Sequence, residues 1–229
     1  MDAGTSRFYD DYAPRLAATE SRRSAMLAHL LAALPAGAWV LDVGAGSGRD
    51  MAALHELGFE PFGVEPNAAM RETALRAHPA LAGRLADATL PGLGRPFAEQ
   101  RPQGFDAVVC SAVLMHLPPD ELPGALASLV RQLRPAAPDD AASHRPTLLL
   151  SLPEMDATQL AGDQDADGRR FHNHAPADVA ALLGGMALTL ALADVNDAVR
   201  ASTGTRWHTL VFRRQAAEAA TGKSVARHL

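Results

Sequence analysis

The feature that most constrains the fold is a glycine-rich turn between a short apolar run and a helical stretch. The apolar run is Trp39–Val43 (WVLDV), and the sequence continues GAGSGRD. Glycines at alternate positions, Gly44, Gly46 and Gly48, permit positive φ angles and let a ligand approach the backbone without meeting a Cβ. The helix N-terminus beyond them presents free N–H groups and a partial positive charge. A strand, a glycine turn and a helix in this order predict a nucleotide-type binding loop.

The rest of the chain alternates between strand and helix patterns, which predicts a mostly parallel sheet with helices on both faces. Residues 88–104 and 153–175 are expected to be irregular. Because no internal repeat and no long linker divides the chain, we expect one domain over residues 1–229, with a frayed tail at 214–229. The expected strands are 39–43, 59–65, 85–87, 105–114, 147–152, 186–195 and 206–213, and the expected helices are 20–34, 49–57, 67–77, 122–133 and 176–184.

The spacing of the glycines distinguishes two kinds of nucleotide-binding loop. A dinucleotide-binding loop reads G-x-G-x-x-G, as in nicotinamide-dependent oxidoreductases. This turn reads G-x-G-x-G, and Arg49 stands where the last glycine of the longer pattern would be. With Asp42 ahead of the glycines, the pattern resembles motif I of class I S-adenosylmethionine-dependent methyltransferases. An oxidoreductase is the alternative that the spacing disfavours.

The resemblance to these methyltransferases covers most of the chain, from about Leu27 to Phe212. FDAVVCSAVLMHLP (105–118) is similar to the family's fourth-strand motif, and LVRQLRP (129–135) to the helix before its fifth strand. The resemblance implies an α/β fold with a doubly wound, seven-stranded, Rossmann-like sheet, mostly parallel, in which only the last strand is antiparallel. It also implies transfer of a methyl group from S-adenosylmethionine.

The resemblance further assigns the cofactor contacts. In the family, the acid ahead of the glycines, here Asp42, orients the loop and the amino-acid end of the cofactor. Glu65 would accept hydrogen bonds from the ribose hydroxyls, although a dinucleotide fold has an acid at a similar place, and Asn67 beside it is expected to cap a helix. Asp87 would accept from the adenine amino group, and the N–H of Ala88 would serve a ring nitrogen. The expected cofactor-binding residues are Tyr9, Tyr12, Asp42, Gly44, Ala45, Gly46, Gly48, Glu65, Pro66, Asp87, Ala88 and Cys110.

An aromatic segment near the N-terminus, Phe8–Tyr12 (FYDDY), precedes the first expected helix. In many members of the resembling family such a segment folds over the cofactor. We therefore expect residues 1–19 to cover it, with the hydroxyl of Tyr9 or Tyr12 meeting the cofactor carboxylate. The alternative is a terminus that only packs on the core.

Few residues are candidates for a catalytic role. A sulfonium methyl group is already electrophilic, so a base is needed only where the acceptor must first lose a proton. His116 follows the fourth strand, at the carboxyl edge where ligands of α/β sheets bind, and is the candidate base; a structural histidine is the alternative. His172 and His174 lie on a loop expected to close the acceptor pocket, with a solvated loop as the alternative.

Two patterns begin like metal sites without completing one. Residues 163–168 (DQDADG) start like a calcium loop, but His174 occupies the twelfth position, where a bidentate Glu is required. His172 and His174 lack further ligands at zinc spacing. We expect no metal and interpret 163–168 as an acidic surface turn. Cys110 is interpreted as a small core residue.

Composition narrows the setting and the partners. The net charge is −5, with 21 basic and 26 acidic residues, whereas proteins that bind nucleic-acid phosphates are usually basic. CSAVL also stands where a nucleic-acid methyltransferase would carry an N/D-P-P-Y motif. A single cysteine permits no intrachain disulfide and favours a reducing, cytoplasmic setting. No segment has the pattern of a membrane span or a leader peptide.

The acceptor is expected to be a small molecule. The cofactor-binding sheet takes most of the chain and leaves residues 1–19, 91–104 and 153–175 to select the acceptor. Nothing in these segments identifies the acceptor or its methylated atom, and the oligomeric state stays open. A cofactor-binding protein without transferase activity and a nucleic-acid or protein methyltransferase are the alternatives.

Overall fold

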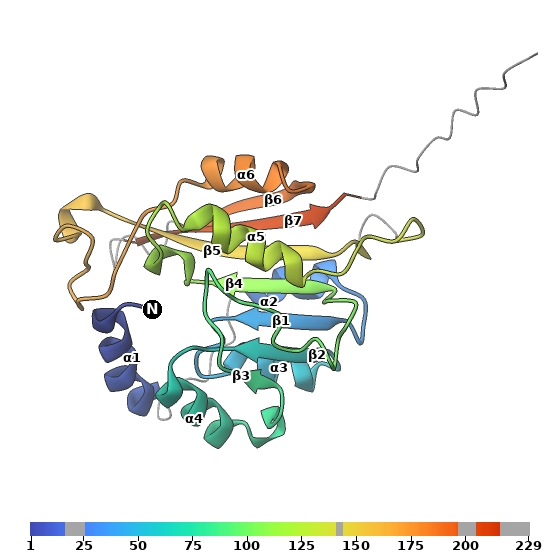
Figure 1. The fold of residues 1–229 in the computed structure, drawn as a ribbon, viewed down its shortest axis with the longest axis horizontal. Coiled ribbons are helices and arrows are strands. Elements are labelled where there is room, and N and C mark those ends of the chain that lie inside the picture. Colours follow the sequence, from blue (N-terminus) through green and yellow to red (C-terminus); the bar gives the residue numbers. More distant parts are fainter. Residues whose placement is uncertain (17–25, 141–143, 197–204, 216–229) are drawn as a thin grey trace, which may run out of the picture.

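A computed structural model describes residues 1–16, 26–140, 144–196 and 205–215. These residues form a seven-stranded sheet in the order β3-β2-β1-β4-β5-β7-β6 (Figure 1). Strand β7 runs antiparallel to both of its neighbours, and the other strands are parallel to one another. The expected fold class is therefore confirmed, including the antiparallel last strand. The strands are β1 Trp39–Val43, β2 Glu60–Val64, β3 Leu85–Ala86, β4 Ala107–Ser111, β5 Thr147–Met155, β6 Leu188–Asn196 and β7 Thr205–Arg214.

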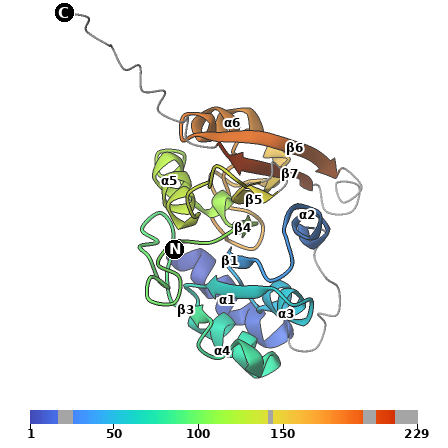
Figure 2. The ribbon, with the colours of Figure 1, turned by 90° about the vertical axis from the view of Figure 1, so that its right-hand side faces the viewer.

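Helices cover both faces of the sheet. In Figure 2, α5 and α2 lie on opposite sides of it. No helix within the described ranges is long and apolar enough to cross a membrane. The α-helices are α1 Ala3–Leu16, α2 Met26–Ala33, α3 Arg49–Glu56, α4 Ala68–Ala77, α5 Leu122–Gln132 and α6 Pro176–Gly184, with short 3₁₀ turns at Pro79–Leu81, Leu114–His116 and Ala157–Gln159.

The core has two layers because successive side chains of each strand point to opposite faces. Leu41 and Val43 of β1 pack in the layer under α5 and α6, whereas Val40 packs in the layer under α2 and α3. The proline- and glycine-rich loop after β3 adds Leu93 and Phe97 to the first layer. Residues 91–104 were expected to help select the acceptor, but this loop contributes its apolar side chains to the core.

Helix α1 was not predicted from the sequence. The Oδ1 atom of Asp2 accepts hydrogen bonds from the N–H groups of Gly4 and Thr5, both at 3.1 Å, which satisfies two unpaired donors of the first turn. The helix lies beside α4, at the edge of the sheet where β1 and β2 end (Figure 1). The first helix expected from the sequence, 20–34, is described only as Met26–Ala33, and residues 17–25 lie outside the described part. The expected tail likewise falls almost wholly on residues 216–229, outside that part.

Strand β5 is longer than the sequence predicts. It pairs with β4 only as far as Ser151, but its antiparallel pairing with β7 continues to Met155 opposite Thr205. Pro153 stands in this extension and hides it from a sequence pattern, because proline lacks the N–H of a regular ladder. The extension projects Pro153 and Met155 beyond the carboxyl edge of the parallel strands.

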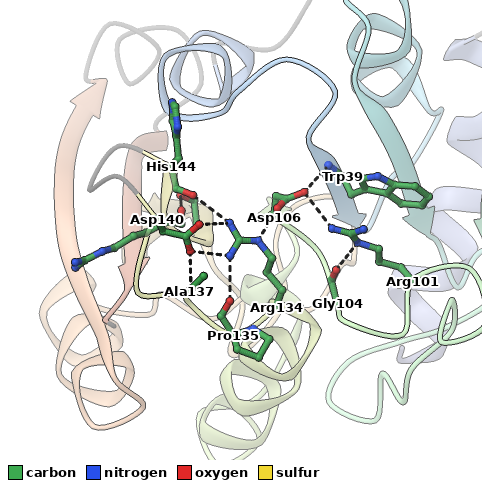
Figure 3. Close-up of polar contacts among 11 residues, drawn as sticks. Trp39, Arg101, Gly104, Asp106, Arg134, Pro135, Ala137, Asp140 and His144 are labelled. Atoms are coloured by element: carbon green, nitrogen blue, oxygen red, sulfur yellow. Dashed lines mark hydrogen bonds and ion pairs between the residues drawn. The ribbon is translucent and has the colours of Figure 1, made fainter. Parts of the chain in front are cut away.

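A charged network fastens the opposite, amino-terminal edge of the sheet (Figure 3). Asp106, just ahead of β4, accepts the backbone N–H of Trp39 at 2.9 Å and the Nε–H of Arg134 at 2.6 Å. Arg101 lies 3.5 Å from the same carboxylate. Arg134 also binds Asp140, and this hydrogen bond lowers the pKa of the Asp140 carboxyl. The starts of β1 and β4 are thereby joined to the segment after α5.

Candidate functional site

The glycine turn is held against the end of β2 by its own backbone. The N–H groups of Gly44 and Ala45 both donate to the carbonyl oxygen of Val64, at 2.8 and 3.0 Å. Gly44 and Gly46 have φ angles of 79° and 54°, in the left-handed region that glycine adopts without strain. A Cβ at Gly44 would also overlap Cγ2 of Val113. The turn therefore exposes bare backbone at the carboxyl edge of the sheet, as predicted.

Gly48 has a different role from its neighbours. Its φ angle is 73°, and a Cβ there would lie 2.9 Å from Cδ1 of Leu81 and 3.1 Å from Cβ of Ala74. Gly48 lies outside the walls of the cavities described below. Because Gly48 has no side chain, the start of α3 can pack closely against Leu81 and Ala74. Packing therefore explains the glycine at this position, and its contact with the cofactor stays a prediction.

Asp42 lies under the glycine turn with only 7% of its surface exposed. Burial, followed by the nearby Asp50 and Glu65, raises the pKa of this carboxyl to about 8, while Arg49 opposes the shift. A buried carboxyl in this state favours a bound cation, because a positive charge beside it stabilises the ionised form. Asp42 also forms part of a cavity wall, as its predicted role requires.

Glu65 links the end of β2 to the glycine turn. Its Oε2 atom accepts the N–H of Gly46 at 3.0 Å, and its Oε1 atom accepts the N–H of Asn67 at 2.8 Å. Burial raises the pKa of the Glu65 carboxyl in spite of these two hydrogen bonds. Asn67 caps α4 by accepting the N–H of Met70, which confirms the predicted cap. Glu65 thus holds the turn in place, and its contact with a ribose stays a prediction.

Three neighbouring cavities of the described chain meet at this edge. The glycine-turn cavity, about 180 Å³, shares Gly44 with an apolar cavity next to it. It shares Tyr12 and Ala112 with an aromatic cavity of about 300 Å³. Ala112 has a φ angle of 56°, unusual for a residue with a Cβ, and follows β4 directly. Besides the shared residues, the glycine-turn cavity is lined by Asp42, Ala45, Gly46, Ser47 and Arg49. The apolar cavity is lined by Pro66, Ala88, Leu90, Val113 and His116. The aromatic cavity is lined by Phe8, Tyr9, Met115, Arg169, Phe171 and Trp207.

Two residues predicted to bind the cofactor, Asp87 and Cys110, line none of the three cavities. The side chain of Asp87 is 67% exposed, and its Oδ2 atom pairs with Nη2 of Arg71 at 3.2 Å. It stands beside the apolar cavity, whereas its neighbour Ala88 lies in the wall. Cys110 is fully buried among core side chains, and burial raises the pKa of its thiol. The Cys110 side chain lines none of the three cavities, which agrees with its interpretation as a core residue.

His116 is held at both ring nitrogens. Nδ1 lies 2.7 Å from the carbonyl oxygen of Arg170, and because a carbonyl only accepts, Nδ1 carries the proton. In the neutral ring Nε2 is then an acceptor, and the hydroxyl of Tyr9 donates to it at 3.1 Å. Burial lowers the pKa of His116 and raises the pKa of Tyr9. His116 lies in the wall of the apolar cavity and Tyr9 in that of the aromatic cavity, so their hydrogen bond joins the two.

The other two histidine candidates do not line the aromatic cavity. Nε2 of His174 lies 2.9 and 3.1 Å from the carbonyl oxygens of Leu114 and Leu117, which fixes the turn that carries His116. The backbone N–H of His172 donates to Met115 at 2.7 Å. The side-chain contacts of His174 favour a structural role for that histidine. The backbone contact of His172 fixes the loop that carries it, and the role of its side chain stays a prediction.

The predicted acidic turn at 163–168 is neutralised from within the chain. Asp165 accepts the N–H groups of Asp167 and Arg169 and pairs with the Arg169 guanidinium at 2.7 Å. Among the described residues, no three His, Cys, Asp or Glu side chains are grouped to hold a metal ion.

Sequence reasoning missed much of the aromatic cavity. Phe171 and Trp207 come from segments far apart in the sequence, and α1 adds Phe8 to the same wall. The only local signal was the aromatic segment Phe8–Tyr12, whose spacing places Phe8 and Tyr12 one helical turn apart. Their rings are stacked, with centroids 5.4 Å apart.

A family comparison identifies this arrangement. Residues 40–136, which hold the glycine turn and most of the predicted cofactor residues, match the family model described as a methyltransferase domain. The chain therefore contains a methyltransferase domain at residues 40–136. No curated protein matches this sequence.

Solved structures share the fold of this chain at low sequence identity. Magnesium protoporphyrin IX methyltransferase from Synechocystis, with bound S-adenosylmethionine, is 18% identical with a TM-score of 0.63, covering 94% of this chain and 98% of that one. The 1,6-didemethyltoxoflavin-N1-methyltransferase of Burkholderia thailandensis, with bound 1,6-didemethyltoxoflavin and S-adenosylhomocysteine, is 22% identical with a TM-score of 0.64, covering 93% and 88%. The cyclase SpnF is 15% identical with a TM-score of 0.64, covering 93% and 95%. Because a cyclase shares it, the fold alone does not specify the reaction.

Proposed function

We propose that this chain transfers a methyl group from S-adenosylmethionine to a small-molecule acceptor by in-line displacement. The observation that carries the proposal is the meeting of the glycine-turn cavity and the aromatic cavity at Tyr12 and Ala112. A cofactor over the glycine turn would then face an acceptor across a short, shared wall. This is the arrangement that a direct transfer between two bound molecules requires.

The residues around the glycine turn fit the cofactor. Asp42 is a buried carboxyl with a raised pKa, and the amino group of the cofactor would supply the cation that it lacks. Gly44 and Gly46 line the glycine-turn cavity with positive φ angles, so a ligand there can approach their backbone without meeting a Cβ. We propose that Glu65 contacts the ribose through its remaining lone pairs, and that Asp87 and Ala88 recognise the adenine edge.

When bound, the cofactor supplies an electrophilic methyl group, so the protein mainly orients the reactants. Holding the reacting atoms about 3–3.5 Å apart and aligned contributes on the order of 7–11 kcal/mol toward the barrier. Tyr12 and Ala112 form the wall that both reactants would touch. Helix α1 closes the two cavities on the side of Tyr9 and Tyr12, which supports the proposal that residues 1–19 cover the cofactor.

The size and surroundings of the aromatic cavity support a small acceptor. Its volume of about 300 Å³ lies at the lower end of ordinary small-molecule sites. The net charge of −5 disfavours a nucleic acid. One of the solved neighbours holds a small heterocyclic compound, 1,6-didemethyltoxoflavin. We propose a single domain over residues 1–229, and the lone, buried Cys110 supports a cytoplasmic setting.

Calorimetry with S-adenosylhomocysteine and, separately, NAD tests the cofactor. We expect the first to bind and the second not to bind. The reverse result would exclude the proposal. A second assay then follows label from methyl-labelled S-adenosylmethionine into a metabolite extract. S-adenosylhomocysteine binding with no labelled product in any extract would favour a cofactor-binding protein without transferase activity.

A further inference from the structure

The aromatic cavity is unusually rich in flat side chains. Aromatic residues make up 5% of the chain, yet five of them line this one cavity. Phe8 and Tyr12 stack nearly parallel, with an interplanar angle of 20°. Flat, apolar walls of this kind gain most from a flat, apolar ligand, because aromatic pairs prefer offset-stacked or edge-to-face contact. The aromatic side chains are Phe8, Tyr9, Tyr12, Phe171 and Trp207.

The charge in the cavity wall disfavours a cationic ligand. Arg169 is the charged residue among the described lining residues, and no carboxylate accompanies it in the wall. The Arg169 guanidinium lies over the ring of Phe8, 4.5 Å from the centroid. Asp165 holds it in this position by accepting a hydrogen bond from its Nε–H. The aromatic face of Phe8 is therefore already occupied by a cation. A cationic ligand would find no carboxylate in this wall to pair with, whereas a neutral or anionic ligand needs none.

The same cavity contains a path for a proton. Tyr9 lines the aromatic cavity, and its hydroxyl donates to the unprotonated Nε2 atom of His116. Burial raises the pKa of Tyr9, so Tyr9 keeps its proton, and lowers the pKa of His116, so the imidazole stays neutral. The carbonyl of Arg170 at Nδ1 then stabilises the imidazolium that forms when Nε2 accepts a proton.

We infer that the aromatic cavity takes a planar aromatic acceptor, neutral or anionic, with an ionisable O–H or N–H group whose proton passes through Tyr9 to His116. This inference rests on the proposed function and adds the acceptor class and a catalytic role for Tyr9. His116, expected from the sequence to be the base itself, acts behind Tyr9 as a positioning residue and final proton acceptor.

The step balances in protons and electron pairs. The acceptor O–H or N–H proton moves to Oη of Tyr9 as the hydroxyl proton of Tyr9 moves to Nε2 of His116. The electron pair left on the acceptor atom forms the new bond to the methyl carbon. The bond between that carbon and sulfur breaks, and its electron pair stays on the sulfur of S-adenosylhomocysteine. The imidazolium of His116 later returns its proton to solvent.

Binding of 4-nitrophenol tests the acceptor class without turnover, in protein saturated with S-adenosylhomocysteine. A Trp39→Phe variant leaves Trp207 as the only tryptophan, because the chain has two. Trp39 lies at the amino-terminal end of β1, away from the cavity. We expect 4-nitrophenol to quench Trp207 fluorescence. Cyclohexanol, which is not planar, and the cationic trimethyl(4-nitrophenyl)ammonium should each bind at least about tenfold more weakly by competition.

The ionisation of bound 4-nitrophenol tests the proton path, because its phenolate form is yellow. In the wild-type complex the ratio of phenolate to phenol should exceed that in Tyr9→Phe and in His116→Asn by about tenfold. Both variants should keep the cooperative urea unfolding of the wild-type protein, whereas a purely structural defect would lower the unfolding midpoint.

Each failure has a separate meaning. If S-adenosylhomocysteine does not bind the wild-type protein, the proposed function fails. If it binds but 4-nitrophenol binds no better than either control compound, the acceptor class is wrong. If 4-nitrophenol binds but ionises equally in the wild type and Tyr9→Phe, the proton path is wrong.

Discussion

At the scale of single residues, Asp42 has the clearest link between electrostatics and binding. Its pKa of about 8 means that most of the ligand-free protein carries a neutral Asp42 at neutral pH. Only the ionised carboxylate pairs with an ammonium group, so the affinity for S-adenosylhomocysteine should rise as the pH approaches about 8. Asp42→Asn should bind at least about tenfold more weakly, with no such rise. Calorimetry over a pH series measures both effects, and an unchanged slope in Asp42→Asn would contradict the assignment.

The raised pKa of Asp42 also predicts that a carboxyl suited to binding the cofactor makes the ligand-free protein less stable at neutral pH. The folded-state pKa lies above the unfolded value, so stability from Asp42 is full in acid, below the unfolded pKa. It is lost as the pH rises toward the folded value of about 8. Without ligand, Asp42→Asn should therefore be more stable than the wild type at neutral pH, by about 1–3 kcal/mol. Urea unfolding at two pH values tests this. The two proteins should converge in acid, and a variant that is less stable at neutral pH would refute the account.

Substituting two glycines with similar backbone angles distinguishes the cost of backbone strain from the cost of overpacking. Gly37 and Gly48 have φ angles of 75° and 73°, but a Cβ at Gly37 meets nothing within 4 Å, whereas one at Gly48 meets Leu81. Gly37→Ala should cost about 1–2 kcal/mol of unfolding free energy from the left-handed backbone alone. Gly48→Ala should cost about 1–3 kcal/mol more from overpacking. Equal losses in chemical unfolding would show that Gly48 is not needed for packing.

At the scale of elements, Asp106 connects the starts of two central strands. Its carboxylate accepts from Trp39 and Arg134 and is 16% exposed. Asp106→Asn removes the charge that both arginines face, so we expect a loss of about 1–3 kcal/mol in unfolding free energy. Asp139→Asn, at an exposed position, is the matched control and should change stability by less than about 0.5 kcal/mol. If both variants unfold at the same urea concentration, the network does not stabilise the sheet.

The elements that sequence predicted well are those with local signals. The glycine turn, its strand and α6 follow from residues next to one another in the chain, and the structure places α6 at Pro176–Gly184 as expected. Helix α1 was missed because it buries only three residues, Thr5, Ala13 and Leu16, which make no regular apolar stripe. Phe97 in the proline-rich loop was missed for the opposite reason. It is buried, but its neighbours resemble a solvated loop.

In the candidate site, too, the residues with a local sequence signal were predictable and the others were not. Asp42 and the glycines were predictable because the motif is contiguous, and Glu65 because it ends the next strand. Trp207 and Phe171 were not, because only the antiparallel β7 and the fold of the 153–175 loop bring them beside α1. No sequence pattern encodes a contact made at that separation.

At the scale of the whole molecule, α1 joins two parts of the carboxyl edge. The side chain of Asn67, ahead of α4, donates to Asp10 at 2.7 Å. On the other side, the N–H of Arg170 donates to the Thr5 hydroxyl at 2.9 Å. The apolar contacts of α1 form a small cluster around Ala13, separate from the main core. A helix fastened mainly by polar contacts at its two sides should open at a lower free energy than the sheet beneath it.

Cofactor binding should therefore slow the opening of α1 more than that of any element far from the site. A ligand bound under α1 at about 100 times its Kd stabilises the closed form by about 2.7 kcal/mol, which slows exchange through that opening about 100-fold. Hydrogen–deuterium exchange with and without S-adenosylhomocysteine should show this protection over Ala3–Leu16 and over the residues around Arg170. Helix α6, which lines none of the three cavities, is the internal control and should exchange at an unchanged rate. Equal protection of α1 and α6 would indicate global stabilisation and contradict a covering role for α1, because the two helices would then open together.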